Sequence, residues 1–398
     1  MSKHDYTALV AALAGHPLPA AILDLDRLDA NAAILRQRAG KLPIRLGSKS
    51  IRCTEVFRRL LVPGSGFEGL LCYSGREAAW LAGQGFDDLL VAYPTTEPAD
   101  LSAVAARLGE GKRITLMVDD PAQLALITAQ PRPEGARWRL AIDLDMSSRF
   151  PGLYFGVQRS PVRSADAVLA LAKAIAAQGE LFDFIGVMGY EAQIAGLQDD
   201  VPGAGLKNRV VRWLKSRSLK EILKRRQDSV AALKAAELAP RLVNGGGTGS
   251  VAETATDSSV TEIAAGSGLY CPGLFDHFSK FKLAPALFFA LPVVRRPAPG
   301  IATCSGGGYI ASGPTGPDRA PLTYLPEGLS LLPLEGAGEV QTPVALPDGV
   351  DLPIGAPVFF RHAKAGELAE RFERFLVMSG GRIVASVPTY RGEGQCFF

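Results

Sequence analysis

Residues 114–128 read Ile-Thr-Leu-Met-Val-Asp-Asp-Pro-Ala-Gln-Leu-Ala-Leu-Ile-Thr, a short apolar run followed by apolar residues at helical spacing. The first part, residues 114–118, predicts a strand, and residues 121–128 predict a helix. Only two aspartates separate the two elements. A strand that passes directly into a helix is the building unit of folds with a parallel sheet.

The same unit recurs on both sides of this stretch. Candidate strands lie at residues 44–46, 69–73, 88–92, 114–118, 137–144, 184–188, 241–243 and 262–265. Most are separated by alanine- and leucine-rich segments with helical periodicity, at residues 75–82, 99–108, 121–128 and 165–177. Eight strands alternating with helices over roughly 240 residues predict an α/β fold, a closed (β/α)8 TIM-type barrel. A doubly wound open sheet is the competing topology.

The amino-acid composition and the helical periodicity of the chain change near residue 285. Proline and glycine become dense there, and short apolar runs alternate with turn residues. This pattern predicts a C-terminal antiparallel β domain at residues 284–398, after a barrel domain at residues 18–283. Residues 1–17 are a candidate addition to the β domain.

Composition narrows the classes of partner. A net charge of +3 over 398 residues gives no argument for nucleic acid or membrane as a partner. Residues 206–234 are rich in lysine and arginine, but they have few interleaved aromatics or base-reading motifs, so a solvated helix is favoured over nucleic-acid binding. Five scattered cysteines without a C-x-x-C pair indicate reduced thiols, and no apolar run is long enough for a membrane span. We expect a cytoplasmic protein.

Two stretches suggest a cofactor. Residues 45–52, Arg-Leu-Gly-Ser-Lys-Ser-Ile-Arg, place Lys49 at the end of the first barrel strand, where barrel enzymes carry their active sites. Lys49 is therefore a candidate for a Schiff base with an aldehyde, the alternative being an ordinary surface lysine. Residues 244–250, Asn-Gly-Gly-Gly-Thr-Gly-Ser, follow the seventh strand, where barrel loops frequently bind phosphate. The alternative for this loop is a flexible turn.

Polar residues also follow the fifth and sixth candidate strands. Asp143, Asp145 and Arg149 end the fifth strand. Tyr190, Glu191 and Gln193 end the sixth. In a parallel barrel all these ends meet at one mouth, so the four clusters predict a functional pocket there.

These motifs resemble the fold type III pyridoxal-phosphate (PLP) enzymes of the alanine racemase N-terminal domain superfamily. Within them the chain is most similar to D-threonine aldolase and eukaryotic-type D-serine dehydratase. The similarity begins at residues 19–31, Pro-Ala-Ala-Ile-Leu-Asp-Leu-Asp-Arg-Leu-Asp-Ala-Asn, and includes the lysine stretch, which in the relatives reads Arg-Pro-His-x-Lys-Thr-His-Lys. It extends through the Gly-Gly-Gly-Thr loop to the series Glu262, Gly268, Tyr270 and Asp276, which resembles their Glu-x-Arg-Pro-Gly-x-Tyr-x-x-x-Asp.

The resemblance implies PLP bound to Lys49 as a Schiff base. It implies further cofactor contacts. Gly246, Gly247 and Thr248 hold the phosphate, Tyr190 lies against the ring, Tyr270 lines the phosphate side, and Arg149 follows the fifth strand. Gln193, in the same motif as Tyr190, is a further cofactor-site residue and, without a metal, a candidate to polarise the substrate's β-hydroxyl. It also implies a small amino-acid substrate and a homodimer.

Departures from the family concern a metal. The relatives hold a divalent ion through a C-terminal His-x-Cys or His-x-Asp pair, whereas this chain reads Arg361-His-Ala-Lys364. The family's Tyr-x-Gly-His likewise becomes Tyr190-Glu-Ala-Gln193. A lysine is a poor ligand for a divalent ion, so we predict no metal. We expect His362 and Lys364 to contact the substrate or to transfer a proton, the alternative for His362 being a strand-end histidine satisfied by the backbone.

The function implied is a PLP-dependent lyase or aldolase, acting by retro-aldol cleavage or dehydration on a D- or β-hydroxy amino acid. An amino-acid racemase or epimerase is the second interpretation, with Tyr270 and Cys271 as candidates for the base on the opposite face. A non-catalytic PLP-binding protein and a sugar-phosphate enzyme remain alternatives.

Overall fold

The computed structural model describes residues 4–397 of the chain. They form two compact units. The barrel unit comprises residues 35–49 and 59–266 together with residue 397, and the sheet unit comprises residues 4–34, 50–58 and 267–396.

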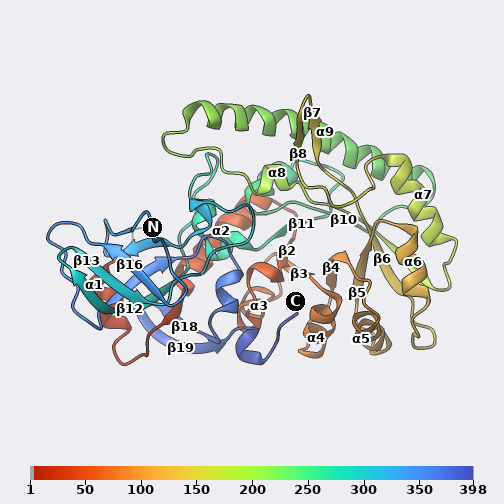
Figure 1. The fold of residues 1–398 in the computed structure, drawn as a ribbon. Coiled ribbons are helices and arrows are strands. Elements are labelled where there is room, and N and C mark those ends of the chain that lie inside the picture. The colour runs from red at the N-terminus through yellow and green to blue at the C-terminus, as the bar shows by residue number, and fades with distance from the viewer. Residues whose placement is uncertain (1–3, 398) are drawn as a thin grey trace. The chain divides into compact units, whose positions relative to one another are not determined.

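The barrel unit contains a closed barrel of eight parallel strands (Figure 1). In chain order the strands are β2 (Ile44–Gly47), β3 (Phe67–Cys72), β4 (Leu89–Pro94), β5 (Ile114–Val118), β6 (Trp138–Asp143), β9 (Phe182–Gly189), β10 (Leu242–Gly245) and β11 (Glu262–Ala265). The barrel closes where β11 pairs with β2, with Ile263 opposite Ile44. The closure confirms the predicted barrel and excludes the open sheet.

Helices cover the outside of the barrel, as Figure 1 shows for the first four. They are α4 (Gly75–Gly83), α5 (Pro98–Gly109), α6 (Pro121–Thr128), α7 (Ala165–Ala176), α8 (Ala192–Ala195), α9 (Gly205–Ala235) and α10 (Val251–Thr254). The start of α6 shows how the sequence sets these boundaries. Asp120 and Gln123 form a reciprocal capping box, and Pro121 occupies the first turn, where its missing N–H costs nothing.

Apolar side chains fill the barrel interior. The buried cluster there includes Leu90, Met117, Ala141, Ile185 and Met188, contributed by four neighbouring strands. Interior and exterior residues alternate along each strand, so this packed core leaves the chemistry to the strand ends.

A hairpin that the sequence did not predict follows β6. Strands β7 (Ser148–Phe150) and β8 (Leu153–Phe155) pair only with each other among the described residues. Ser148 and Ser218 join this hairpin to α9 through a 2.8 Å hydrogen bond between their hydroxyls, and Phe150 packs against Trp213. The basic segment 206–234 lies within the 31-residue helix α9, whose buried face includes Ile222.

The sheet unit is built on nine strands. They are β1 (Ala20–Asp24), β12 (Leu287–Ala298), β13 (Ile301–Ser305), β14 (Leu322–Leu325), β15 (Ser330–Leu331), β16 (Gln341–Ala345), β17 (Pro357–Arg361), β18 (Arg374–Ser379) and β19 (Arg382–Pro388). Its pairings are antiparallel except that between β1 and β18. Four helices contribute residues to this unit: α1 (Tyr6–Ala12), α2 (Leu25–Ala39), α3 (Thr54–Leu60) and α11 (Ser267–Tyr270).

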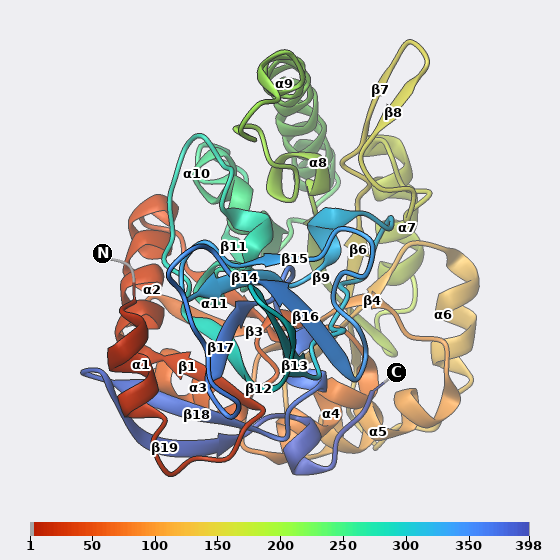
Figure 2. The same cartoon turned by 60° about the vertical axis from the view of Figure 1, so that its left-hand side comes forward.

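The division of the chain differs from the predicted boundaries at residues 18–283 and 284–398. Strand β1 lies inside the sheet, paired with both β12 and β18, and all five of its residues are buried as a result. Helix α1 packs Leu9 and Leu13 against Ile22 and Phe288 of the sheet, and Figure 2 shows it beside β1 and β18. An opening strand therefore completes a sheet whose other strands come from the C-terminal third.

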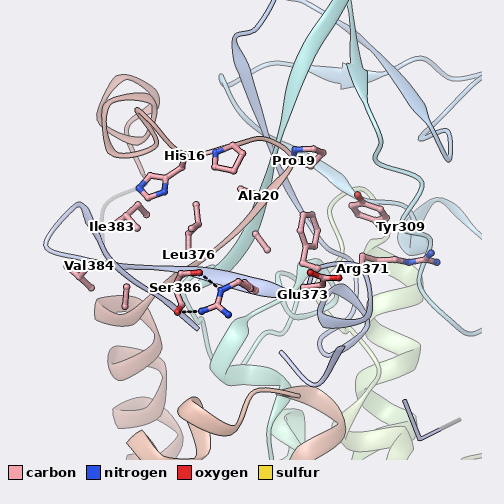
Figure 3. A pocket seen from close by; sticks show the side chains of 15 residues that line it. His16, Pro19, Ala20, Tyr309, Arg371, Glu373, Leu376, Ile383, Val384 and Ser386 are labelled. Atoms are coloured by element: carbon pink, nitrogen blue, oxygen red, sulfur yellow. Dashed lines mark hydrogen bonds between the residues drawn. The ribbon is translucent and has the colours of Figure 1, made fainter. Parts of the chain in front are cut away.

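A groove of about 830 Å³ lies on the sheet unit (Figure 3). Its wall includes Arg374, whose Nε donates to Ser386 Oγ at 2.8 Å. The other lining side chains include His16, Tyr309, Arg371 and Glu373. No helix among residues 4–397 is both long and apolar enough to cross a membrane.

Candidate active site

Lys49 stands at the mouth of the barrel. It lies in the single 3-10 turn Ser48–Ser50 that follows β2, and Ser48 ties this turn to β3 by donating its hydroxyl to the Leu71 carbonyl at 3.0 Å. The Lys49 side chain is exposed, and its Nζ donates to Tyr93 Oη at 3.1 Å. A lysine held at this place by a polar partner has the position that Schiff-base chemistry requires.

Tyr93 is a site residue that the sequence analysis missed. It lies near the end of β4, with the guanidinium carbon of Arg159 5.9 Å from its ring centroid. Burial raises the pKa of Tyr93, but the positive charges of Lys49 and Arg159 outweigh burial and lower the pKa below its ordinary value. Its place at a strand end was the available signal, the same one that drew attention to Asp143 and Tyr190.

The glycine loop after β10 requires its glycines. Gly246 has φ +91°, a conformation that other residues rarely adopt. A Cβ on Gly247 would lie 2.7 Å from Ala195 Cβ and 3.1 Å from the ring of Tyr190. The loop backbone therefore packs closely against Ala195 and the Tyr190 ring, and a residue larger than glycine at position 247 would displace one of them.

A buried charge network holds this loop in place. Glu191 accepts hydrogen bonds from the Gly246 N–H at 2.8 Å and the Thr254 hydroxyl at 2.6 Å. Arg226 bridges Glu191 at 3.2 Å and Asp257 at 3.0 Å, and all three charged side chains are almost completely buried. The Gly246 amide, predicted as a phosphate donor, thus serves the network, while the Gly247 amide donates to Ser250 Oγ at 3.2 Å. The phosphate role of Gly246, Gly247 and Thr248 stays a prediction.

Tyr190 and Gln193 follow β9 but face different neighbours. Tyr190 lies against the glycine loop, and burial together with nearby Tyr93 raises its pKa to about 12, so it is a neutral phenol at ordinary pH. The Gln193 amide nitrogen donates to the Met146 carbonyl at 2.6 Å and to Ser218 Oγ at 2.9 Å. Gln193 thus ties α8 to the segment after β6 and to α9.

Two arginines follow β6, and they are placed differently. Arg149, the predicted cofactor residue, lies on the hairpin strand β7 with its side chain exposed, 6.0 Å from the Tyr154 ring centroid. Arg159 follows the hairpin and lies against Tyr93 instead. An inserted hairpin separates the two, and sequence alone cannot show which arginine returns to the mouth.

The other predicted residues belong to the sheet unit. Tyr270 is buried and donates its hydroxyl to the Ile51 carbonyl at 3.0 Å. Burial raises the pKa of Cys271 to about 12, which leaves it a protonated thiol. Lys364 is partly exposed and donates to Ser312 Oγ at 2.7 Å. These contacts anchor the side chains within the sheet unit, and their catalytic roles stay predictions.

His362 directly follows β17 and is 2% exposed. Burial and the neighbouring Arg361 guanidinium lower its pKa to about 3. Neither ring nitrogen makes a hydrogen bond of good geometry within residues 4–397. The imidazole is therefore neutral at ordinary pH, and a role as a cationic acid is unavailable to it in this environment.

The charges nearest the lysine stretch are paired. Arg45 on β2 binds Glu262 at 2.6 Å and Asp88 at 3.1 Å. Asn244 donates to the same Glu262 at 2.7 Å, which links β2, β11 and β10 below the mouth. These contacts fix the positions of the lysine turn and the glycine loop relative to each other along the barrel axis.

Comparisons with known proteins agree with this architecture. Residues 23–272 match the family model of the alanine racemase N-terminal domain. Two curated relatives are 3-hydroxy-D-aspartate aldolases from Paracoccus denitrificans, one of them from strain Pd 1222, at 27% and 28% identity. Each match covers 63% of this chain, and the chain spans 59% of the relatives' length.

Solved structures show the same fold. D-threonine aldolase from Filomicrobium marinum superimposes with a TM-score of 0.78 at 21% identity, covering 94% of this chain and 95% of the other. D-threo-3-hydroxyaspartate dehydratase from Delftia sp. HT23 gives a TM-score of 0.70 at 20% identity, covering 96% and 98%. At these identities the likeness establishes the shared fold.

Proposed function

This chain belongs to the alanine racemase N-terminal domain family, and on that premise we propose that it is a PLP-dependent lyase of β-hydroxy amino acids. The substrate has the D configuration, and the reaction is retro-aldol cleavage of the Cα–Cβ bond. The relatives named above act on D-3-hydroxyaspartate and the structures include a D-threonine aldolase, which supports this substrate class.

The observation that carries the proposal is the arrangement of Lys49 and the glycine loop at one mouth of one barrel. Lys49 would hold the cofactor's aldehyde carbon, and Gly247 with Thr248 would border its phosphate. Tyr190, whose ring lies beside Gly247, would lie against the cofactor ring. When bound, PLP accepts the electron pair left on Cα after a bond there breaks.

The chain's own residues then control protons and position. Tyr93, hydrogen-bonded to Lys49 Nζ, keeps the lysine at the mouth and can exchange a proton with it. Arg159 adds a positive charge that suits a substrate carboxylate. The Glu191–Arg226–Asp257 network keeps the glycine loop in one conformation. Because these residues hold the substrate in one position, the reacting bond is presented in one orientation.

The proposal includes three further statements. The enzyme works without a metal, because Lys364 replaces the second ligand of the relatives' pair. It acts as a homodimer, which the resemblance supports, and it resides in the cytoplasm. Each has its own measurement: activity with and without a chelator, mass in solution, and the cell fraction that contains the protein.

The deciding experiment uses purified protein reconstituted with PLP. We expect a visible absorbance band from lysine-bound cofactor, absent in Lys49→Ala and retained in Lys41→Ala, an exposed lysine before β2. A panel of D- and L-β-hydroxy amino acids should release an aldehyde from D isomers only. Ammonia and oxo-acid in place of aldehyde would indicate dehydration. Exchange of the Cα hydrogen with solvent deuterium, without loss of amino acid, would indicate a racemase.

A further inference from the structure

Asp143 lies across the barrel mouth from Lys49. The closed strand order is β10-β11-β2-β3-β4-β5-β6-β9, so β6 is four strands from β2 in either direction. Lys49 follows β2, and Asp143 is the last residue of β6. The glycine loop follows β10, two strands from β2 on the side away from β4. A cofactor extending from Lys49 to that loop leaves the side of the mouth formed by β4, β5 and β6 to the substrate.

Three carboxylates gather at this side, and two of them have structural partners. Asp145 accepts hydrogen bonds from the Ser147 amide at 2.7 Å and the Tyr154 hydroxyl at 3.1 Å. Asp119 accepts one from the Gln123 side chain at 2.7 Å. Asp143 is only partly buried, and its carboxylate takes part in no hydrogen bond or ion pair with residues 4–397. It is the carboxylate at this mouth that is available to a substrate.

The charged groups facing Asp143 are Asp119 from the end of β5, Asp145 from its own segment, and Arg159 from the loop after β8. Burial and the two like charges raise the pKa of Asp143 to about 7, with Arg159 opposing the shift. A carboxyl with this pKa can both take and return a proton near neutral pH, which is the property that general catalysis requires.

We propose that Asp143 is the base that removes the proton from the substrate's β-hydroxyl group during Cα–Cβ cleavage, a role that rests on the proposed function. The hydroxyl O–H bond breaks, its proton passes to the Asp143 carboxylate, and the C–O bond becomes the C=O of the released aldehyde. The electron pair of the broken Cα–Cβ bond stays with Cα, which afterwards takes a proton. Asp143 then returns its own proton to solvent, so the carboxylate is regenerated.

Other groups of the barrel mouth are less suited to this step. Tyr190, with a pKa of about 12, is a phenol that holds its proton too tightly. The Gln193 amide does not titrate and is bound to Met146 and Ser218. The Tyr93 hydroxyl already accepts a hydrogen bond from Lys49. Among these groups, Asp143 combines a carboxylate that no residue of 4–397 hydrogen-bonds or pairs with and a proton affinity suited to neutral pH.

The first test is a titration of the cofactor-free protein. NMR of protein labelled with 13C at the aspartate side-chain carboxyls, from about pH 4 to about pH 9, should show one resonance that titrates near neutrality rather than in the ordinary aspartate range. That resonance should be missing in Asp143→Asn. It should move to lower pH in Asp119→Asn, which removes a like charge, and to higher pH in Arg159→Gln, which removes an opposite one.

The second test uses the reconstituted enzyme. The kcat for aldehyde release should rise with pH through the range in which Asp143 loses its proton. Asp143→Asn should lower kcat by about 10²- to 10⁴-fold, remove this rise and keep the visible cofactor band. Asp143→Glu should restore part of the rate, and Asp200→Asn, at an exposed loop position, should match the wild type.

The outcomes separate this inference from the proposed function. Wild-type protein without the cofactor band or without aldehyde release would overturn the function and the role of Asp143 together. A wild type that releases aldehyde, combined with an Asp143→Asn variant of equal kcat and unchanged pH profile, would overturn the inference alone. An Asp143 resonance that titrates in the ordinary range, or a wild-type rate that falls through neutrality, would also overturn it.

Discussion

Removal of Glu191 is the sharpest test of how the barrel prepares its glycine loop. The Glu191 carboxylate accepts hydrogen bonds from Gly246 N–H and Thr254, and pairs with Arg226 at a site where both side chains are 1% exposed. Glu191→Ala leaves the Gly246 amide without this acceptor and Arg226 with only one carboxylate. Breaking a buried ion pair by removing one partner costs about 3–5 kcal/mol.

The expected loss can be read as a melting temperature. For a unit of roughly 220 residues, each kcal/mol corresponds to about 2–4 °C, so Glu191→Ala should lower the Tm of the barrel by about 10 °C. Calorimetry and urea unfolding of cofactor-free protein both measure this change. Retention of PLP on dialysis should fall as well, because the loop loses the bond that orders Gly246.

Glu221→Ala is the matched control. Glu221 pairs with Arg225 on the surface of α9, where its side chain is 45% exposed, so its removal should cost less than about 1 kcal/mol. If Glu191→Ala and Glu221→Ala changed the free energy of unfolding equally, the buried network would not stabilise the loop. A stable Glu191→Ala protein that retains PLP like the wild type would refute the reasoning outright.

Three further predictions concern the mouth. In cofactor-free protein, a titration followed by tyrosinate absorbance should show one tyrosine that ionises at lower pH than the others. This component should vanish in Tyr93→Phe and move to higher pH in Lys49→Ala. An unchanged titration curve in both variants would contradict the pairing of Tyr93 with Lys49. Gly247→Ala should weaken PLP binding by at least about tenfold, equivalent to about 1.4 kcal/mol, because its methyl group would lie 2.7 Å from Ala195 Cβ. Gly205→Ala is the control, because a Cβ there meets no atom within 4 Å, and this variant should bind PLP as the wild type does. Equilibrium dialysis measures both. Activity should survive prolonged chelation and dialysis, and recovery of a lost activity by a divalent ion would contradict the proposal of a metal-free enzyme.

The barrel was predictable because its signal is local. Residues 114–118 and 262–265 form strands β5 and β11 with the predicted bounds, and residues 121–128 form α6. In each case a short apolar run or a capped periodic stretch determines the element by itself. Residues 69–73 differ by one or two positions from β3, which is where local pattern no longer decides the boundary.

The long-range pairing of β1 was harder to predict from the sequence. Residues 20–24 are recognisable as a strand, but nothing in them indicates that their partners are residues 287–290 and 375–378. A fully buried apolar strand fits a parallel barrel as well as the centre of a mixed sheet. The choice depends on contacts across more than 250 residues, so the predicted domain boundary at residue 18 could not be corrected from the sequence.

The candidate site was predictable where geometry follows from strand order, and not where an insertion intervenes. Lys49 and the glycine loop stand at strand ends, and any parallel barrel brings such ends to one mouth. Arg149 was chosen because it follows the fifth predicted strand closely. The β7–β8 hairpin carries it away, and Arg159 occupies the place beside Tyr93.

The absence of histidines around Lys49 in the sequence has a consequence for proton transfer at this site. The relatives carry histidines next to this lysine in the sequence. In this chain the Tyr93 phenol hydrogen-bonds Lys49, and the Arg159 guanidinium lies against the Tyr93 ring. Neither titrates near neutrality in its ordinary state, so a proton acceptor for that range must come from a group whose pKa the site itself displaces. Asp143, opposite Lys49 and crowded by two other carboxylates, is such a group. The chemistry then depends on repulsion among the carboxylates at the ends of β5 and β6. Neutralising Asp119 should therefore change the pH dependence of the enzyme, even though that residue need not touch the substrate.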